Sequence, residues 1–183
     1  YIYHIGPLFR QHMFMVMFET LAVVVLAHIT TIPDRSRRRT MIAGLLLLLA
    51  AGYTKQLAVM TVAATFIFLF LRGPRRALAW GVLFAAVAGG LFLLLNVATG
   101  GQWWANIIAA NVNAYMPQQA LDLFRQWLRL HWPLALLAAL FALYELYFAR
   151  LSLYTVWWGA AFATAALSGK WGAGDSYFAT AIA

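Results

Sequence analysis

Long apolar runs alternate along the chain with short polar segments. The apolar runs cover about residues 8–30, 41–52, 57–71, 77–98, 133–149 and 151–168. Helical runs of this length and composition are typical of membrane-spanning segments. The pattern predicts an all-α fold, namely a polytopic helical membrane protein with about six hydrophobic helical segments, arranged as one transmembrane domain over residues 1–183.

The run between Met41 and Leu71 is too long for one crossing. As a single helix it would extend about 46 Å at ~1.5 Å per residue, against a hydrocarbon core of ~30 Å. Arginines flank it on both sides, at residues 35–39 and 72–76. We therefore expect a hairpin with its apex at residues 52–56. Before it, we expect a turn that breaks the first helix at Pro33 and carries the four arginines of residues 35–39.

The region between residues 99 and 132 is the longest polar stretch, and residues 118–130 within it show helical amphipathicity. Leu121, Phe124 and Trp127 share one face, whereas Asp122, Arg125 and Arg129 share the other. This pattern predicts an interfacial helix that lies along the membrane surface.

The distribution of charged residues predicts how the chain is oriented in the membrane. The net charge is +8, yet only 10% of residues are charged and 64% are hydrophobic. The arginines cluster in short connections, which favours the positive-inside pattern over a nucleic-acid partner. We expect a cytoplasmic set of Arg35, Arg37, Arg38, Arg39, Arg72, Arg75, Arg76 and Arg150, and an outer set of Arg10, Lys55, Arg125, Arg129 and Lys170. The chain begins without methionine and ends within an apolar run, so we expect an internal fragment of a longer membrane protein.

Lys55 and Lys170, the two lysines in the chain, are predicted on the same outer face. An ionisable side chain at membrane depth marks a functional site by default. Two cations that converge there favour a lipid-linked phosphate as ligand, although a snorkelling Lys55 and an interfacial anchor at Lys170 remain alternatives. Arg10 is a third phosphate-binding candidate, and further donor or acceptor contacts are expected from His12, Gln56, Asn111, Asn113 and Tyr177.

Candidates for acid–base chemistry are few. Asp175 is a weak candidate for a general base or a metal ligand, and the catalytic residues are otherwise unknown. No metal-ligand spacing is visible, so a divalent metal is possible but not indicated, and no cofactor is expected. Glu19, within the first apolar run, is expected to pair with a cation on another helix or to reach a cavity. Glu145 is expected near the inner interface, solvated or paired.

Four stretches resemble the C-type (GT-C) membrane glycosyltransferases, close to the bacterial relatives of the dolichyl-phosphate-mannose protein mannosyltransferases (family 39-like). They are Gly6-Pro-Leu-Phe-Arg10, Ala51-Gly-Tyr-Thr-Lys-Gln56, Thr99-Gly-Gly-Gln-Trp-Trp104 with Asn111-Val-Asn113, and Ser168-Gly-Lys-Trp-Gly-Ala173 with Tyr177-Phe178. Ser176 stands where asparagine is expected.

The resemblance implies a polyprenyl-phosphate-sugar donor, transfer with inversion in the bacterial plasma membrane, and an extracytoplasmic acceptor that is a glycan, lipid or protein. It also implies that the catalytic acidic residues lie in a loop that precedes Tyr1. Two other functions stay open. A non-enzymatic lipid-phosphate binder or flippase would also need outer cations, and a secondary transporter would need ionisable residues near the midplane.

Overall fold

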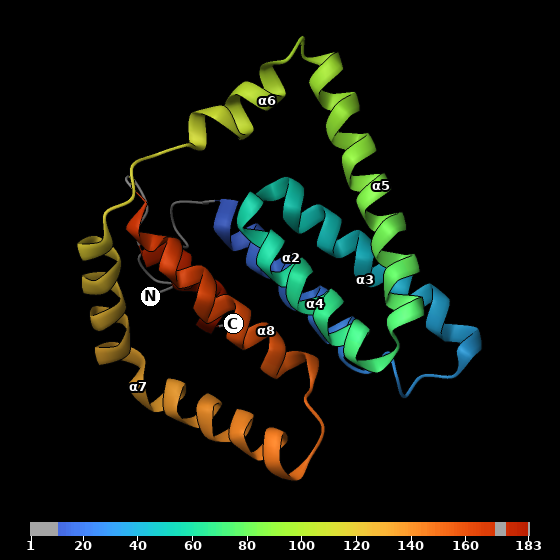
Figure 1. Cartoon of the computed structure of the whole chain (residues 1–183), viewed down its shortest axis with the longest axis vertical. Coiled ribbons are helices and arrows are strands. Elements are labelled where there is room, and N and C mark those ends of the chain that lie inside the picture. Colours follow the sequence, from blue (N-terminus) through green and yellow to red (C-terminus); the bar gives the residue numbers. More distant parts are fainter. Residues whose placement is uncertain (1–10, 171–174, 183) are drawn as a thin grey trace.

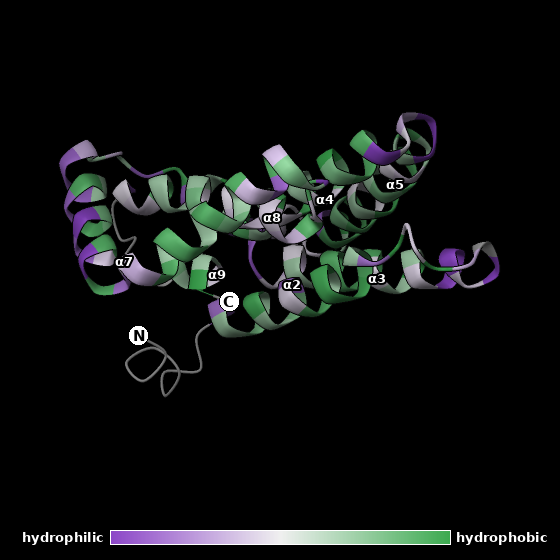
Figure 2. Ribbon diagram, turned by 90° about the horizontal axis from the view of Figure 1, so that it is seen from below, coloured by the Kyte–Doolittle hydropathy of each residue, from purple (hydrophilic) through white to green (hydrophobic). Residues whose placement is uncertain are grey.

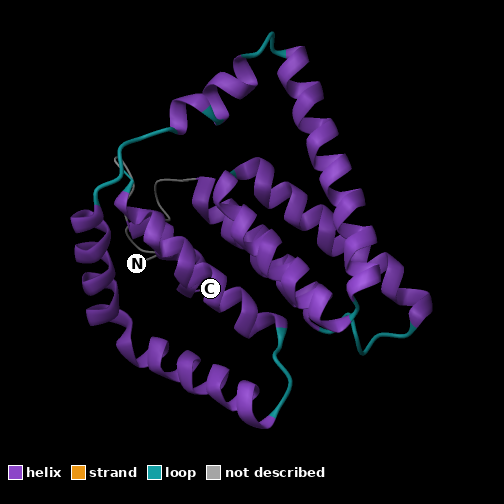
Figure 3. Ribbon diagram, viewed as in Figure 1, coloured by secondary structure: helices purple, strands orange, loops and turns teal. Residues whose placement is uncertain are grey.

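The computed structural model describes residues 11–170 and 175–182, and within these ranges the chain is helical with no named strand. The prediction of an all-α fold is therefore confirmed. Short 3-10 turns cover residues 56–58, 109–111, 165–169 and 175–178. The α-helices are α2 (Gln11–Ala27), α3 (Asp34–Thr54), α4 (Val59–Arg72), α5 (Pro74–Ala98), α6 (Gln102–Ile107), α7 (Pro117–Phe148), α8 (Leu153–Thr164) and α9 (Ala179–Ile182) (Figure 3).

The central helices form two layers. Figure 2 shows α2 and α3 side by side in one layer, with α4, α5 and α8 in the other. The largest core cluster joins the layers, with Leu26 of α2, Leu48 of α3 and Leu153 of α8 fully buried. Gly44 lets α2 approach α3 closely, because a Cβ there would lie 2.4 Å from Cγ of Leu26.

The helix ends gather at two ends of this bundle (Figure 1). The start of α2, the α3–α4 junction, α6 and the end of α8 lie at one end, and the α2–α3, α4–α5 and α7–α8 connections lie at the other. We call the first the lysine end, because it holds Lys55 and Lys170. The second is the arginine end, because its connections and adjoining turns carry Arg35, Arg37, Arg38, Arg39, Arg72, Arg75, Arg76 and Arg150.

The arginines after Pro33 lie within a helix, so our prediction of a non-helical turn over residues 34–39 is wrong. The turn falls earlier, where the N–H of Thr31 donates to His28, and α3 begins at Asp34 with the N–H of Arg37 donating to the Pro33 carbonyl. Proline fits just before a helix start, and arginine is a good helix former, so nothing in residues 34–39 opposes the helix.

Helix breaks elsewhere follow local chemistry. Lys55 adopts an extended conformation between α3 and α4. Gly100 and Gly101 have φ of 58° and 88°, a left-handed conformation that glycine adopts without a steric cost, and they reverse the chain after α5. α7 continues through the expected boundary between residues 130 and 133, but it kinks at His131 because Pro133 lacks the N–H that an α-helix needs.

Two of the described helices, α5 and α7, are long and apolar enough to cross a membrane, whereas the helices over 11–27 and 56–72 are apolar but shorter. The most apolar windows of α5 and α7 are 0% and 6% buried, which is unlike the core helices of a water-soluble protein. Val97 and Phe148 leave 78% and 81% of their surface exposed. These two helices suggest a membrane protein, since large exposed apolar surfaces mark lipid or protein contacts.

Candidate functional site

Three of the predicted site residues meet at the lysine end, and each comes from a different segment. Lys55 lies at the α3–α4 junction, His12 in the first turn of α2, and Tyr177 in the 175–178 turn. The Lys55 ammonium nitrogen lies 3.3 Å from Nδ1 of His12 and 5.7 Å from the centre of the Tyr177 ring. The His12 and Tyr177 ring centres are 5.8 Å apart. We call these three residues the Lys55 cluster.

The chemistry of the Lys55 cluster is that of a cation held by neutral groups. An ammonium can only donate, so Nδ1 of His12 acts as the acceptor in this contact. The imidazole is 5% exposed. Burial raises the pKa of the Tyr177 phenol above its ordinary value of about 10, so the phenol stays protonated at neutral pH. The described cluster thus combines one positive charge with hydroxyl and ring donors, a set that suits an anion.

Lys170 lies at the same end, and its backbone is fixed to the start of α7. The N–H of Met116 donates to the Gly169 carbonyl at 2.7 Å, and Nε2 of Gln119 donates to the Ser168 carbonyl at 2.8 Å and to that of Lys170 at 3.3 Å. A Cβ on Gly169 would lie 2.8 Å from the Tyr115 ring, so this approach requires glycine. The described contacts of the Lys55 cluster do not include Lys170.

Sequence reasoning missed Gln119 as the side chain that holds this segment. The position falls at the start of the predicted interfacial helix, and nothing in the local sequence distinguishes its amide from the other polar side chains there. Tyr115 also supports the segment, since its hydroxyl donates to the Ala166 carbonyl at 2.9 Å.

Two of the predicted amide contacts bind the segment between α5 and α7 instead. Gln56 donates through Nε2 to the Ile107 carbonyl, which ties the start of α4 to α6. Nδ2 of Asn111 donates to the same carbonyl at 3.0 Å and to that of Asn106 at 3.2 Å. Asn113 is exposed in the segment that leads to α7. The loop that carries these amides is thereby linked to the residue next to Lys55.

An apolar cavity of about 350 Å³ adjoins the α3–α4 junction, between α3, α5 and α6. Gly52, Tyr53 and Gln56 line it from the junction, Val59 and Val62 from α4, and Phe92 and Trp103 from α5 and α6. Tyr53 spans the cavity edge, because its hydroxyl donates to the Ala88 carbonyl at 2.7 Å and its ring stacks on Trp103. A cavity that could hold a hydrocarbon chain is therefore lined by residues that are close to Lys55 in the sequence.

The remaining candidates lie partly outside the described residues. Arg10 falls outside the described residues, as does the side chain of Asp175, and neither can be related to the Lys55 cluster. Among the residues that the structure describes, no group of three His, Asp or Glu side chains is arranged to hold a metal ion.

Glu19 is fully buried in α2 and pairs with hydroxyls, so our expectation of a cationic partner does not match its described contacts. Its Oε1 accepts from Thr61 at 2.6 Å and its Oε2 accepts from Thr180 at 2.9 Å. The Thr61 oxygen also accepts from the indole of Trp157 at 3.0 Å. This network links α2, α4, α8 and α9 below the Lys55 cluster and gives Glu19 a structural role.

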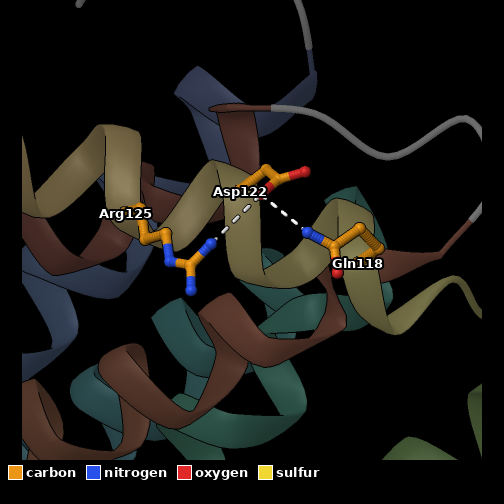
Figure 4. Close-up of polar contacts among 3 residues, drawn as sticks. All are labelled: Gln118, Asp122 and Arg125. Atoms are coloured by element: carbon orange, nitrogen blue, oxygen red, sulfur yellow. Dashed lines mark hydrogen bonds and ion pairs between the residues drawn. The ribbon is translucent and has the colours of Figure 1, made fainter.

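Two other carboxylates also have local roles. Oε2 of Glu145 accepts from the N–H of Ser152 and the hydroxyl of Thr155, so it ties α7 to the start of α8. Ser152 itself is the N-cap of α8, because its Oγ accepts from the N–H of Thr155. Asp122 lies on the surface of α7, where Oδ1 accepts from Gln118 at 3.0 Å and lies 3.7 Å from Arg125 (Figure 4). The side chains of this ion pair are 60–68% exposed, so it contributes little stability.

Comparisons of the chain with protein-family models, with curated proteins and with solved structures found no significant match.

Proposed function

We propose that this chain is part of an integral-membrane glycosyltransferase that moves a sugar from a polyprenyl-phosphate donor to an extracytoplasmic acceptor. The acceptor is a glycan, a lipid or a protein, and the membrane is the bacterial plasma membrane. In this proposal α2, α3, α4, α5, the second half of α7 and α8 cross the bilayer. The lysine end faces outward and the arginine end faces the cytoplasm, in agreement with the positive-inside rule.

One observation carries the proposal: Lys55, His12 and Tyr177 converge at the α3–α4 junction. Other residues of that junction, Gly52, Tyr53 and Gln56, line an apolar cavity. A lipid-linked phosphate needs a cation for its head and hydrocarbon surface for its chain, and the lysine end offers both. The motifs that resemble C-type glycosyltransferases fall at this same end, at residues 51–56, 99–113 and 168–170.

The reaction breaks the bond between the anomeric carbon and the phosphate oxygen, and the electron pair stays on the phosphate. Lys55 stabilises the negative charge that develops there, because an ammonium in a desolvated site binds the leaving phosphate more tightly than the donor. The acceptor hydroxyl attacks from the opposite face. Its proton passes to a carboxylate that the resemblance assigns to a preceding loop.

Transfer by the full-length protein in membranes tests the proposal. Lys55→Ala should lower the transfer rate by about 10²–10³-fold, as expected when one stabilising group is lost from a charged transition state. Lys170→Ala should cost less, since Lys170 is not among the described contacts of the Lys55 cluster. Arg129→Ala removes one exposed positive charge of α7 and serves as the matched control, with transfer unchanged.

Two results would overturn it. If the Lys55→Ala protein transfers sugar at the wild-type rate, Lys55 has no role in transfer. Donor lipid that binds the wild-type protein, and is flipped or held without any transfer to acceptor, would make the chain a lipid-phosphate binder or flippase instead. A substrate flux coupled to an ion gradient would identify a secondary transporter.

A further inference from the structure

A second cavity, of about 580 Å³, lies at the arginine end between α2, α3, α4 and α5. Four arginines line it: Arg37 and Arg38 from α3, Arg72 from the end of α4, and Arg76 from the start of α5. No acidic side chain is among the described residues of its lining. Four guanidinium groups from three helices therefore line one space.

Two of these arginines are fixed by the fold. Nε and Nη2 of Arg37 donate to the carbonyls of Ile29 and Ile32 at 3.1 and 2.9 Å, which ties α3 to the preceding turn. Nη2 of Arg72 donates to the Leu151 carbonyl at 2.6 Å. Arg38 and Arg76 are exposed and have no hydrogen bond or ion pair to another described residue. Their guanidinium groups thus keep their full donor capacity for a ligand.

Most of the remaining lining residues are apolar. Ile29, Leu69 and Trp80 form part of the wall, and the neighbouring surface of α4 and α5 exposes Leu71 at 62%, Leu78 at 59% and Val82 at 71%. Figure 2 shows hydrophilic residues gathered at the start of α3, beside these apolar helices. An occupant that satisfies both surfaces carries a negative head and an apolar chain.

We propose that this cavity binds the phosphodiester headgroup of an anionic phospholipid, with the acyl chains along α4 and α5. Guanidinium groups bind phosphate oxygens in paired, charge-assisted hydrogen bonds, and basic pockets between membrane helices take anionic lipid headgroups. A free phosphate would use the arginines but would leave the apolar wall unfilled. The site is separate from the Lys55 cluster, which lies at the other end of the bundle, and it stands whether or not the chain takes part in sugar transfer.

Lipid retention by the purified full-length protein tests this site. Native mass spectrometry would compare bound phosphatidylglycerol with bound phosphatidylcholine of the same acyl chains. The wild type should prefer phosphatidylglycerol. Arg38→Gln with Arg76→Gln should lower that preference by roughly 25-fold, since each basic residue near an anionic lipid adds roughly a factor of five.

The matched control is Arg39→Gln with Arg75→Gln. It removes the same two charges from the adjacent positions, which do not line the cavity, and it should keep the wild-type preference. If the first pair fails to fold, Arg38→Lys with Arg76→Lys keeps the charge, loses the paired hydrogen bonds, and should lower the preference severalfold.

Three outcomes would overturn the proposal. If the test pair and the control pair lose the preference for phosphatidylglycerol equally, the preference arises from general surface charge and not from the cavity. If the Arg38 and Arg76 variants keep the wild-type preference, the cavity does not bind the lipid headgroup. Displacement of phosphatidylglycerol by millimolar inorganic phosphate would make the ligand a free phosphate rather than a lipid.

Discussion

The Lys55 ammonium lies 3.3 Å from Nδ1 of His12, a residue 43 positions earlier in the chain. His12 therefore positions the cation that we assign to the donor phosphate. His12→Ala removes the acceptor and should lower kcat for transfer about tenfold with a smaller change in the KM for the lipid donor. Lys55 acts on the charge of the leaving phosphate, and one hydrogen bond to a charged group contributes roughly 1.5–3 kcal/mol. His12→Asn keeps an acceptor near the same position and should restore most of the rate. Equal kinetics for the alanine variant and the wild type would contradict the positioning role.

Gly44 and Gly52 provide a matched pair within α3. A Cβ at Gly44 would lie 2.4–2.8 Å from three side-chain carbons of Leu26, which is fully buried and would have to shift within the core, whereas a Cβ at Gly52 meets nothing within 4 Å. Gly44→Ala should destabilise the protein by about 1–3 kcal/mol. Gly52→Ala should be neutral or stabilising by up to about 1 kcal/mol, since alanine favours a helix. Thermal unfolding in detergent measures both, and a higher melting temperature for Gly44→Ala would refute the close α2–α3 packing.

Glu19 makes a testable contribution to folding. Glu19→Ala leaves the Thr61 and Thr180 hydroxyls without their acceptor, and each buried hydroxyl without a partner costs about 1–3 kcal/mol. Glu19→Gln keeps one acceptor and should cost less than the alanine change. Asp122→Ala, on the exposed surface of α7, is the control and should alter stability by less than about 0.5 kcal/mol. A Glu19→Ala protein as stable as the control would rule out the network as a structural element.

Gly169 should be intolerant of any side chain. The Met116 carbonyl oxygen, the Tyr115 ring and the Ala120 Cβ would all lie within 3 Å of a new Cβ. Gly169→Ala should separate the 165–170 segment from α7 and increase proteolytic cleavage near Lys170, because the hydrogen bonds of Met116 and Gln119 to this segment would lengthen. Gly159→Ala, in α8 with open space around it, should leave the cleavage pattern unchanged.

Sidedness can be tested directly, because the chain contains zero cysteines. Lys55→Cys and Lys170→Cys should both react with a membrane-impermeant maleimide added outside intact cells. Arg39→Cys, at the arginine end, should react only after the membrane is opened. Labelling of positions 55 and 170 from opposite sides would end the proposal that both belong to one outward-facing region.

Most helix breaks could be predicted from local sequence. Pro33, the Gly73–Pro74 pair and the Gly100–Gly101 pair all lie at breaks, because their backbone preferences end or begin helices wherever they occur. The extent of helix around the arginines could not be predicted in the same way. A run such as residues 35–39 is equally compatible with a solvated turn and with a first helical turn, and the start of α3 at Asp34 decided between them.

The contacts of the candidate site were harder to predict than its residues. The sequence favoured placing His12, Lys55 and Tyr177 toward one face, but their mutual contact depends on how α2 packs on α3 and where the 175–178 turn returns. Glu19 shows the same limit. Its burial followed from its place in an apolar run, whereas its hydroxyl partners come from α4 and α9, which are distant in sequence.

The shortness of α4 has a consequence for the surrounding bilayer. Its 14 residues extend about 21 Å, against a hydrocarbon core of ~30 Å. Lipids that meet so short a helix relieve the hydrophobic mismatch by local thinning. In the proposed orientation, this thinning would draw the headgroup layer inward to the level of Lys55. A long isoprenoid carrier could then present its phosphate to the protein while its chain remained dissolved in the membrane.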